Sequence, residues 1–190
     1  MSTIFKDSAV FRWSCDMDNP ITALVVMGVS GCGKSCVGES IVEHIDGYLI
    51  EGDQFHPPAN IEKMSTGVPL TDEDRADWLA RLGQELASAL ETHDRPLLAC
   101  SALKRKYRDR LREAVPGLGF VFLELSREEA ARRVGDRPGH FMPASLIDSQ
   151  FATLESPSGE PATLTLDATL PIDTLGQKAA DWWRSADSTR

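Results

Sequence analysis

The sequence predicts one α/β domain with a five-stranded parallel sheet, and three observations support this fold class. Short apolar runs alternate with longer segments of helical periodicity, which is the pattern of repeated strand–helix–strand units. The apolar runs are nearly unbroken, as in strands that helices cover on both faces. The chain has 190 residues, of which 42% are hydrophobic and 26% charged, and these values match a single globular domain.

Each expected strand is a short apolar run. The first ends at a glycine-rich turn, and the fourth has no polar residue before Glu124. Both features fit central strands of a covered sheet. The five expected strands are residues 21–27, 48–51, 96–101, 120–125 and 162–166.

The expected helices follow from periodicity and from their first turns. In residues 34–46, apolar side chains recur on one face at helical offsets. Another helix is expected to begin after Thr71, because acidic residues fill its first turn, where carboxylates oppose the helix dipole. Its buried stripe is expected at Trp78, Leu82, Leu86 and Leu90. The remaining helices are expected at residues 104–114, 127–134, 143–154 and 172–184. We expect an irregular connection at residues 52–70 and a flexible one at residues 135–140.

Composition and charge exclude several classes of protein. The net charge of −9 argues against a protein that coats nucleic acid. Residues 101–140 nevertheless carry +4, which suits binding of small anions and equally suits solvated helix faces. No stretch approaches the ~18 apolar residues of a membrane span, and residues 1–10 lack a signal-peptide pattern. With four cysteines, Cys15, Cys32, Cys36 and Cys100, we expect reduced thiols and a soluble, cytoplasmic protein.

Residues 1–20 have no usable periodicity. We expect them to be a flexible N-terminal extension, with a single domain at residues 21–190. We hypothesise that residues 1–16 are dispensable or that the natural start is Met17.

Residues 28–35, Gly-Val-Ser-Gly-Cys-Gly-Lys-Ser, match the phosphate-binding pattern G-x-x-x-x-G-K-[ST] between an expected strand and helix. Backbone N–H groups and the positive end of the helix dipole would surround phosphate oxygens. Lys34 would reach the outer phosphates and Ser35 would hold Mg²⁺. An accidental glycine turn is the alternative, and the complete motif disfavours it. The expected nucleotide-binding residues are Gly28, Val29, Ser30, Gly31, Cys32, Gly33, Lys34 and Ser35.

A carboxylate at the end of the second strand is the candidate for work on an acceptor. The third strand ends in Ala-Cys-Ser, without the Asp that switch GTPases and motor ATPases use to assist Mg²⁺. Asp53 follows the second strand instead, near the phosphate loop. There it would orient or deprotonate an acceptor hydroxyl and contact a metal-bound water. The alternative is that Asp53 caps a short turn and that His56 is an ordinary loop residue.

Seven blocks occur in order along the chain, at residues 28–35, 52–64, 69–75, 78–79, 100–108, 139–142 and 150–154. Together they cover roughly residues 21–185 and resemble the gluconokinase family, which belongs to the small P-loop kinases. The resemblance implies a three-layer P-loop kinase fold with a mobile lid at residues 132–142. It also implies Mg²⁺-dependent phosphorylation of D-gluconate by ATP at the 6-hydroxyl, and it suggests a homodimer.

The resemblance also implies roles for individual residues. Asp53 would align the acceptor hydroxyl and take part in the metal site with Ser35. Arg133 and Arg137 of the lid would stabilise the transferring phosphoryl group, and Arg133 would also contact the nucleotide. Gluconate needs a cation for its carboxylate and polar groups for its hydroxyls. The candidates for these contacts, besides Asp53, are His56, Lys63, Arg75, Lys104, Tyr107, Arg108 and His140.

Some interpretations stay open at this point. A kinase for another small hydroxy acid, such as shikimate or another sugar acid, is one alternative function, and a nucleotide-dependent switch protein is a more distant one. Arg132 is either a surface residue or an adenine contact. We expect Arg105, Arg110 and Arg112 to be solvated. The thiol of Cys32, near Lys34 and a helix N-terminus, is predicted to favour the thiolate and to make the protein sensitive to thiol reagents.

Overall fold

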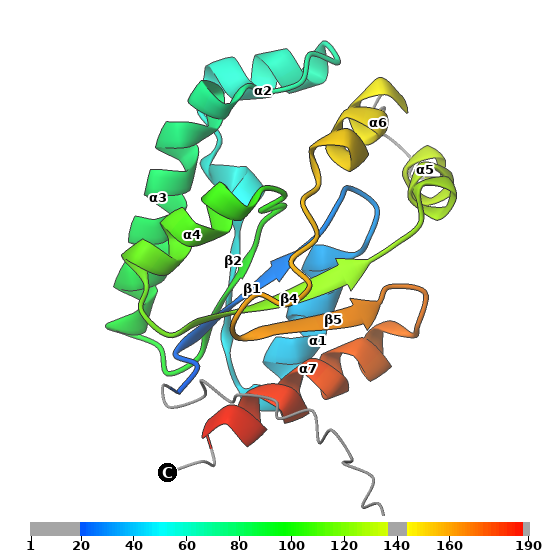
Figure 1. Ribbon diagram of the computed structural model, residues 1–190. Coiled ribbons are helices and arrows are strands. Elements are labelled where there is room, and N and C mark those ends of the chain that lie inside the picture. The colour runs from blue at the N-terminus through cyan, green and yellow to red at the C-terminus, as the bar shows by residue number, and fades with distance from the viewer. Residues whose placement is uncertain (1–19, 137–143, 188–190) are drawn as a thin grey trace, which may run out of the picture.

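The computed structural model describes residues 20–136 and 144–187, and its centre is a parallel sheet (Figure 1). The strand order is β2-β3-β1-β4-β5, and every neighbouring pair is parallel. The fold class expected from the sequence is therefore confirmed. The strands are β1 (Ala23–Met27), β2 (Tyr48–Glu51), β3 (Pro96–Ala99), β4 (Leu118–Glu124) and β5 (Thr163–Asp167).

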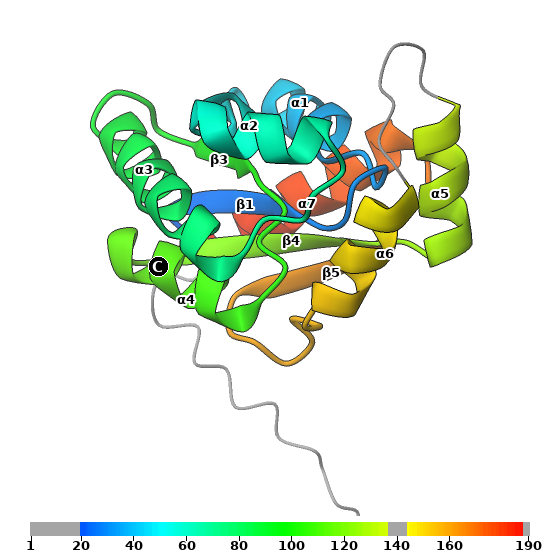
Figure 2. The ribbon, with the colours of Figure 1, turned by 90° about the horizontal axis from the view of Figure 1, so that it is seen from above.

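Helices cover both faces of the sheet, which makes three layers (Figures 1 and 2). Successive side chains of a strand point to opposite faces, so β1 contributes to two cores. Leu24 and Val26 pack in the core with α1 and α7, whereas Val25 and Met27 pack in the core with α3 and α4. The helices are α1 (Lys34–Ile45), the 3-10 turn η1 (Gly52–Phe55), α2 (Pro58–Ser65), α3 (Asp72–Leu90), α4 (Arg105–Ala114), α5 (Arg127–Gly135), α6 (Ala144–Thr153) and α7 (Ile172–Asp187).

Two local features account for the placement of helices. Thr71 caps α3 as expected: its Oγ1 accepts a hydrogen bond from Asp74 N at 3.2 Å, and Asp74 Oδ2 accepts one from Thr71 N at 2.9 Å. Such a reciprocal pair satisfies two N–H groups that the helix itself leaves unpaired. Between α1 and α7 the contact is close, since a Cβ built on Gly176 would lie 2.1 Å from Ser40 Oγ.

The expectation of an irregular connection at residues 52–70 was wrong. This stretch contains η1 and α2, and α2 starts at Pro58, a residue type suited to the first turn of a helix. Contacts from α3 hold α2 in place, because Asn60 Nδ2 donates to Asp74 O at 2.8 Å. The turn-rich composition of residues 52–70 did not predict α2, which is stabilised by its contact with α3.

Other boundaries differ by a few residues. Strand β4 begins at Leu118 rather than at residue 120, and α7 continues to Asp187 rather than ending at 184. The predicted extension with Met17, the hypothesis about residues 1–16, and the part of the predicted lid beyond residue 136 lie outside the described residues.

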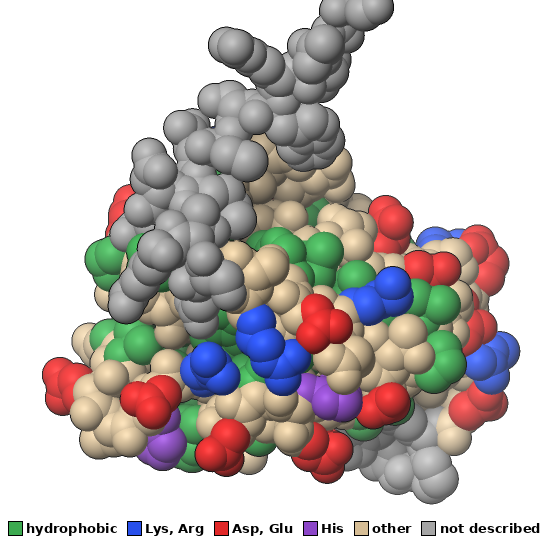
Figure 3. Space-filling model, turned by 90° about the horizontal axis from the view of Figure 1, so that it is seen from below, with side chains coloured by type: hydrophobic (Ala, Val, Ile, Leu, Met, Phe, Trp, Pro, Cys, Tyr) green, Lys and Arg blue, Asp and Glu red, His purple; other side chains and the backbone are tan. Residues whose placement is uncertain are grey.

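Within the described part of the chain, no helix is long and apolar enough to span a membrane. On the face shown in Figure 3, acidic and basic side chains are interspersed rather than gathered into a continuous basic surface.

Candidate active site

The phosphate-loop motif connects β1 to α1 at the carboxyl edge of the sheet, with α2, α5 and α6 around this end (Figures 1 and 2). The loop needs glycine at two positions in particular. Gly28 has φ +142°, and a Cβ there would lie 2.8 Å from Leu123 O. Gly31 has φ +85°, and its Cβ would lie 3.0 Å from Ala130 O of α5. Because neighbouring backbone occupies the space of a side chain, the loop can adopt this tight cradle only with glycine.

Lys34 and Ser35 begin α1 and point in different directions. Lys34 Nζ donates to Gly28 O at 3.2 Å and to Val29 O at 3.1 Å, so its ammonium lies over the loop. Ser35 Oγ donates to Glu51 Oε2 at 3.0 Å. Glu51 is the last residue of β2. The metal site predicted from the sequence comprised Ser35 and Asp53 and did not include Glu51.

The donor set beside the phosphate loop fits Mg²⁺. A hydroxyl and a carboxylate are hard oxygen ligands, and Mg²⁺ is usually held by few protein ligands together with substrate phosphates and water. In residues 20–136 and 144–187, no group of three or more His, Cys, Asp or Glu side chains is arranged to hold a metal ion.

Gln150 of α6 is a second residue that sequence reasoning missed. Its Oε1 accepts a hydrogen bond from Ser30 N at 2.7 Å, and its Nε2 donates to Ser30 Oγ at 3.0 Å. The side-chain amide thus binds the third residue of the phosphate loop at two points. Gln150 is the first residue of the block at residues 150–154 that resembles the gluconokinase family, and this resemblance is the sequence signal that could have identified it.

The prediction that Cys32 favours the thiolate was wrong. Its side chain is buried in the core with Val29 and Val134. Burial raises the pKa of the Cys32 thiol, and this effect outweighs the lowering by the charges of Lys34 and Arg133. Helix α5, which carries Arg133, packs against the phosphate loop, because a Cβ on Gly31 would lie 3.1 Å from Val134 Cγ2.

On the acceptor side, η1 carries an exposed Asp53 beside a buried His56. The imidazole stacks on Trp78, with ring centroids 4.2 Å apart and planes at 12°, and its Nε2 lies 3.9 Å from Asp53 Oδ1. Burial lowers the pKa of His56, which favours the neutral ring. Among the described residues, His56 Nδ1 has no hydrogen-bond partner although it is buried. Trp78 is fixed in turn, since its Nε1 donates to Gly52 O at 2.8 Å.

Three charged side chains, those of Asp53, Lys34 and Arg75, affect the pKa of the buried Cys100 thiol just after β3. The pKa of Cys100 is raised to about 12, mainly by burial and also by the charge of Asp53, although a backbone hydrogen bond with Ala102 and the charges of Lys34 and Arg75 act to lower it. These three side chains come from η1, α1 and α3. Lys34 lies over the loop that follows β1 and Asp53 follows β2, so both predicted site residues lie at the carboxyl edge of the sheet, on either side of β3.

Asp72 organises the remaining acceptor-side candidates. It accepts hydrogen bonds from Lys104 Nζ at 2.8 Å, from Lys106 Nζ at 2.5 Å and from the hydroxyl of Tyr107. These donors hold the pKa of Asp72 well below its usual range. Burial and the bond to Asp72 raise the pKa of Tyr107 to about 12, and the Arg75 guanidinium carbon lies 5.8 Å from the centre of the Tyr107 ring.

Lys63 has a different partner from the other predicted cations. Its Nζ donates to Asp74 Oδ1 at 2.6 Å, which joins α2 to the first turn of α3. Its side chain is nevertheless 43% exposed, so it still reaches solvent.

The structure gives Arg108 a different place from the expected substrate contact. Its side chain is fully buried and forms an ion pair with Glu160. Its Nη1 donates to Ala102 O at 2.9 Å and to Leu103 O at 3.1 Å. Protein acceptors thus occupy the guanidinium, and Arg108 supports the loop between β3 and α4.

Arg112, expected to be solvated, is also largely buried. Its Nη2 bonds to Glu160 Oε2 at 2.9 Å, and its guanidinium carbon lies 4.5 Å from the centre of the Phe120 ring. The apolar stem and planar head of arginine allow this packing.

The predicted lid arginines are only partly described. Arg133 Nε donates to Glu129 Oε1 at 2.7 Å and its Nη2 donates to Ala168 O at 3.0 Å. Arg132 is 62% exposed and pairs with Glu129 and Asp136. Arg137 and His140 lie outside the described residues.

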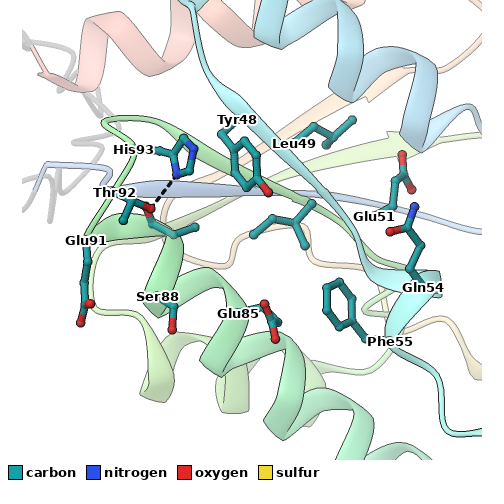
Figure 4. Close-up of a pocket in the computed structure, with 12 residues that line it drawn as sticks. Tyr48, Leu49, Glu51, Gln54, Phe55, Glu85, Ser88, Glu91, Thr92 and His93 are labelled. Atoms are coloured by element: carbon teal, nitrogen blue, oxygen red, sulfur yellow. Dashed lines mark hydrogen bonds between the residues drawn. The ribbon is translucent and has the colours of Figure 1, made fainter.

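A cavity of about 470 Å³ lies between β2 and the second half of α3, where Tyr48 and His93 stack with ring centroids 3.9 Å apart. Figure 4 shows Glu85, Ser88 and Phe55 along one side of it and β2 along the other. Glu51, which lines this cavity, also accepts the hydrogen bond from Ser35 of the phosphate loop. None of the residues predicted from the sequence to bind nucleotide or acceptor lines it.

Comparisons with known proteins show what this chain is similar to. Residues 24–157 match a family model described as an AAA domain. The chain is 50% identical over 137 residues to a gluconokinase of Gluconobacter oxydans, covering 72% of this chain and 77% of the relative. It is 41% identical over 138 residues to the thermosensitive gluconokinase of Escherichia coli, covering 73% and 74%. The crystal structure of a gluconokinase from Sinorhizobium meliloti superposes with a TM-score of 0.79 at 49% identity, covering 89% of this chain and 95% of that one.

Proposed function

The chain belongs to the gluconokinase family, and on this basis we propose that it transfers the terminal phosphoryl group of ATP to the 6-hydroxyl of D-gluconate. The products would be 6-phospho-D-gluconate and ADP. The observation that supports this best is the hydrogen bond from Ser35 Oγ to Glu51 Oε2. It joins the phosphate loop, over which Lys34 lies, to the end of β2, directly before the 3-10 turn that carries Asp53. A phosphate-binding cation and an acceptor-binding carboxylate at this edge of the sheet would then serve one transfer.

The phosphate loop would bind ATP through its backbone N–H groups and Lys34. The ammonium of Lys34 now donates to two loop carbonyls, and phosphate oxygens are stronger acceptors because the bond is then assisted by charge on both partners. Ser35 and Glu51 would hold Mg²⁺ at the adjacent oxygens, with Asp53 beside them as the sequence predicted. Bound Mg²⁺ supplies neutralisation of the phosphate charge.

The acceptor-side residues would bind and orient the sugar acid. The exposed carboxylate of Asp53 would accept a hydrogen bond from the acceptor hydroxyl and align it for in-line transfer. Burial lowers the pKa of His56, which favours the neutral ring, so His56 would not compete with the acceptor as a charged partner of Asp53. Arg75, Lys104 and Tyr107 would bind the carboxylate and hydroxyls of gluconate, with Asp72 keeping Lys104 and Tyr107 in place.

Other parts of the proposal have less support in the described residues. Arg133 would stabilise the transferring phosphoryl group only after exchanging its present partners, Glu129 and the carbonyl of Ala168. The lid, Arg137, His140, Lys63 as a substrate contact and the homodimer stay predictions that rest on the family. We also propose a cytoplasmic location, with which the free thiols of Cys32, Cys36 and Cys100 agree.

A coupled assay of ADP release with ATP and Mg²⁺ tests the function. D-gluconate should support turnover, whereas shikimate, glucose and the absence of an acceptor should not. Lys34→Ala and Asp53→Asn should each abolish gluconate-dependent turnover. As a matched control for Asp53→Asn, Asp173→Asn alters an exposed carboxylate at the start of α7 and should leave turnover unchanged.

The same assay separates the alternatives. Turnover with another aldonate or with shikimate, but not with gluconate, would retain a small-molecule kinase and overturn the substrate. ADP release independent of any acceptor would indicate the nucleotide-dependent switch instead.

A further inference from the structure

Residues 150–160, which we name the strap, run from α6 towards β5 and contact two loops of the proposed active site (Figures 1 and 2). At the start of the strap, the side-chain amide of Gln150 binds Ser30 of the phosphate loop through both Oε1 and Nε2. The two residues are 120 positions apart in the chain. A two-point amide contact fixes the orientation of both partners, because one group must donate and the other accept.

In its middle, the strap holds the residues on either side of Lys104. Glu155 N donates to Leu103 O at 2.8 Å, and Glu155 Oε2 accepts a hydrogen bond from Arg105 N at 2.7 Å. Lys104 is the N-cap of α4, yet its own side chain makes no capping hydrogen bond. The carboxylate of Glu155 therefore satisfies an N–H group in the first turn of α4 that the helix leaves unpaired.

At its end, the strap reaches the same loop through Glu160. Glu160 pairs with the buried Arg108, which donates to Ala102 O and Leu103 O. Ala102 has φ +43°, a conformation that disfavours residues with a Cβ and persists only where neighbouring groups enforce it. The ion pair and its two carbonyl contacts provide that enforcement.

Between its two sets of contacts the strap is anchored by the partly buried Leu154, whereas Ala152, Glu155 and Ser156 are exposed. Leu154 packs against both hydrophobic cores, and its N–H donates to Gln150 O at 2.9 Å. Only four residues separate Gln150 from Glu155, so the contact with Ser30 and the contacts beside Lys104 lie on one short segment. A direct backbone contact, Gly28 N to Ser101 O at 3.3 Å, also joins the two loops.

We propose that the strap couples the nucleotide site to the acceptor site, with Gln150 and Glu155 as its positioning residues. Binding of a nucleotide orders Ser30 and, through Gln150 and Glu155, orders the backbone that carries Lys104. The acceptor then binds to a loop that is already ordered, so each ligand raises the affinity of the protein for the other. The identity of the acceptor rests on the proposed function, whereas the mechanical link between the two loops does not.

Calorimetry on the full chain measures this coupling. The dissociation constant of D-gluconate is determined with and without Mg²⁺ and a non-hydrolysable ATP analogue, and the ratio is the coupling factor. We expect a factor of about 10 for the unaltered protein, within the usual range for allosteric coupling. Gln150→Met and Glu155→Met, which retain side-chain size but remove the polar contacts, should each lower it at least fivefold. Their double variant should lose no more than either one, because both break the same link.

Two control variants separate coupling from a general loss of structure. Gln177→Met removes an exposed amide of α7 that bonds only to Asp181 among its described contacts, and it should leave the coupling factor unchanged. Glu155→Gln keeps an acceptor oxygen for Arg105 N and should restore most of the coupling. Affinity for the ATP analogue alone should change less than threefold in every variant.

Hydrogen exchange provides a readout that needs no acceptor. In the unaltered protein, the ATP analogue should slow amide exchange in residues 100–108, and Gln150→Met should abolish this protection. A coupling factor unchanged by both methionine variants, or equal protection of residues 100–108 with and without Gln150, would overturn the strap. A protein that shows the protection but neither binds nor phosphorylates gluconate would retain the strap and overturn the proposed function.

Discussion

Ser35 Oγ donates a hydrogen bond of 3.0 Å to Glu51 Oε2, which links the first turn of α1 to the last residue of β2. The phosphate-loop serine and the end of β2, which is separated from β1 by β3 in the sheet, thus form one polar site. The Glu51 carboxylate supplies a negatively charged oxygen beside the Ser35 hydroxyl, where Mg²⁺ is expected to bind.

Glu51→Gln tests this site. An amide oxygen still accepts the Ser35 hydrogen bond, but the charge that would attract Mg²⁺ is lost. We expect the Mg²⁺ concentration for half-maximal ADP release to rise about 10–100-fold, the usual range for a residue that supports a metal site. Glu124→Gln, an exposed carboxylate at the end of β4, is the control and should leave the Mg²⁺ requirement unchanged. An equal response of the two variants would remove Glu51 from the metal site.

Cys32 should react slowly with thiol reagents although it lies in the phosphate loop. Its burial raises the pKa of the thiol and blocks access of the reagent. In native protein treated with iodoacetamide at pH 7.5, mass spectrometry should show Cys36, which is partly exposed, labelled before Cys32. In denaturant the two should react at similar rates. Faster labelling of Cys32 in the native state would contradict the assigned burial.

Gly176→Ala should destabilise the protein by about 1–3 kcal/mol, as overpacking of a core typically does. The new Cβ would meet Ser40 Oγ at 2.1 Å and the Ser40 backbone carbon at 3.0 Å, so rotation of the serine side chain cannot relieve the whole clash. Gly135→Ala is the matched control, because Gly135 also lies in a helix and its Cβ would meet nothing within 4 Å. Denaturant unfolding should show loss of stability in the first variant and none in the second.

Asp72 should contribute stability that depends on pH. Hydrogen bonds from Lys104, Lys106 and Tyr107 hold its pKa below the usual value, so the folded state favours the ionised carboxylate. Its contribution is therefore complete above the unfolded pKa of about 4 and is lost progressively as the pH falls below that value, where the unfolded chain takes up the proton first.

The difference in free energy of unfolding between the unaltered protein and Asp72→Asn should accordingly be constant near pH 7 and shrink below pH 4. Asp173→Asn, at an exposed residue whose described partner is His44, provides the comparison. A difference for Asp72→Asn that grew on acidification would show that the three donors do not favour its charged form.

Gly28 and Lys34 illustrate what the sequence by itself determined. Both belong to eight consecutive residues whose type and order specify a strand, a tight turn and a helix start, so the motif carries its own geometry. The alternating strands and helices are determined in the same way, because side-chain periodicity is a local property of the backbone. The capping of α3 by Thr71 also depends on neighbours only three residues away.

Glu51, Gln150 and Arg108 show what only the tertiary structure decided. Gln150 contacts Ser30 across 120 residues, and Arg108 pairs with Glu160 across 52; neither pairing follows from residue type or spacing. The burial that raises the pKa of Cys32 comes from side chains of other helices and strands. Sequence motifs specify local backbone geometry, whereas the partners and the burial of a side chain depend on how distant elements pack. This packing distinguished the residues that face the site from those that support it.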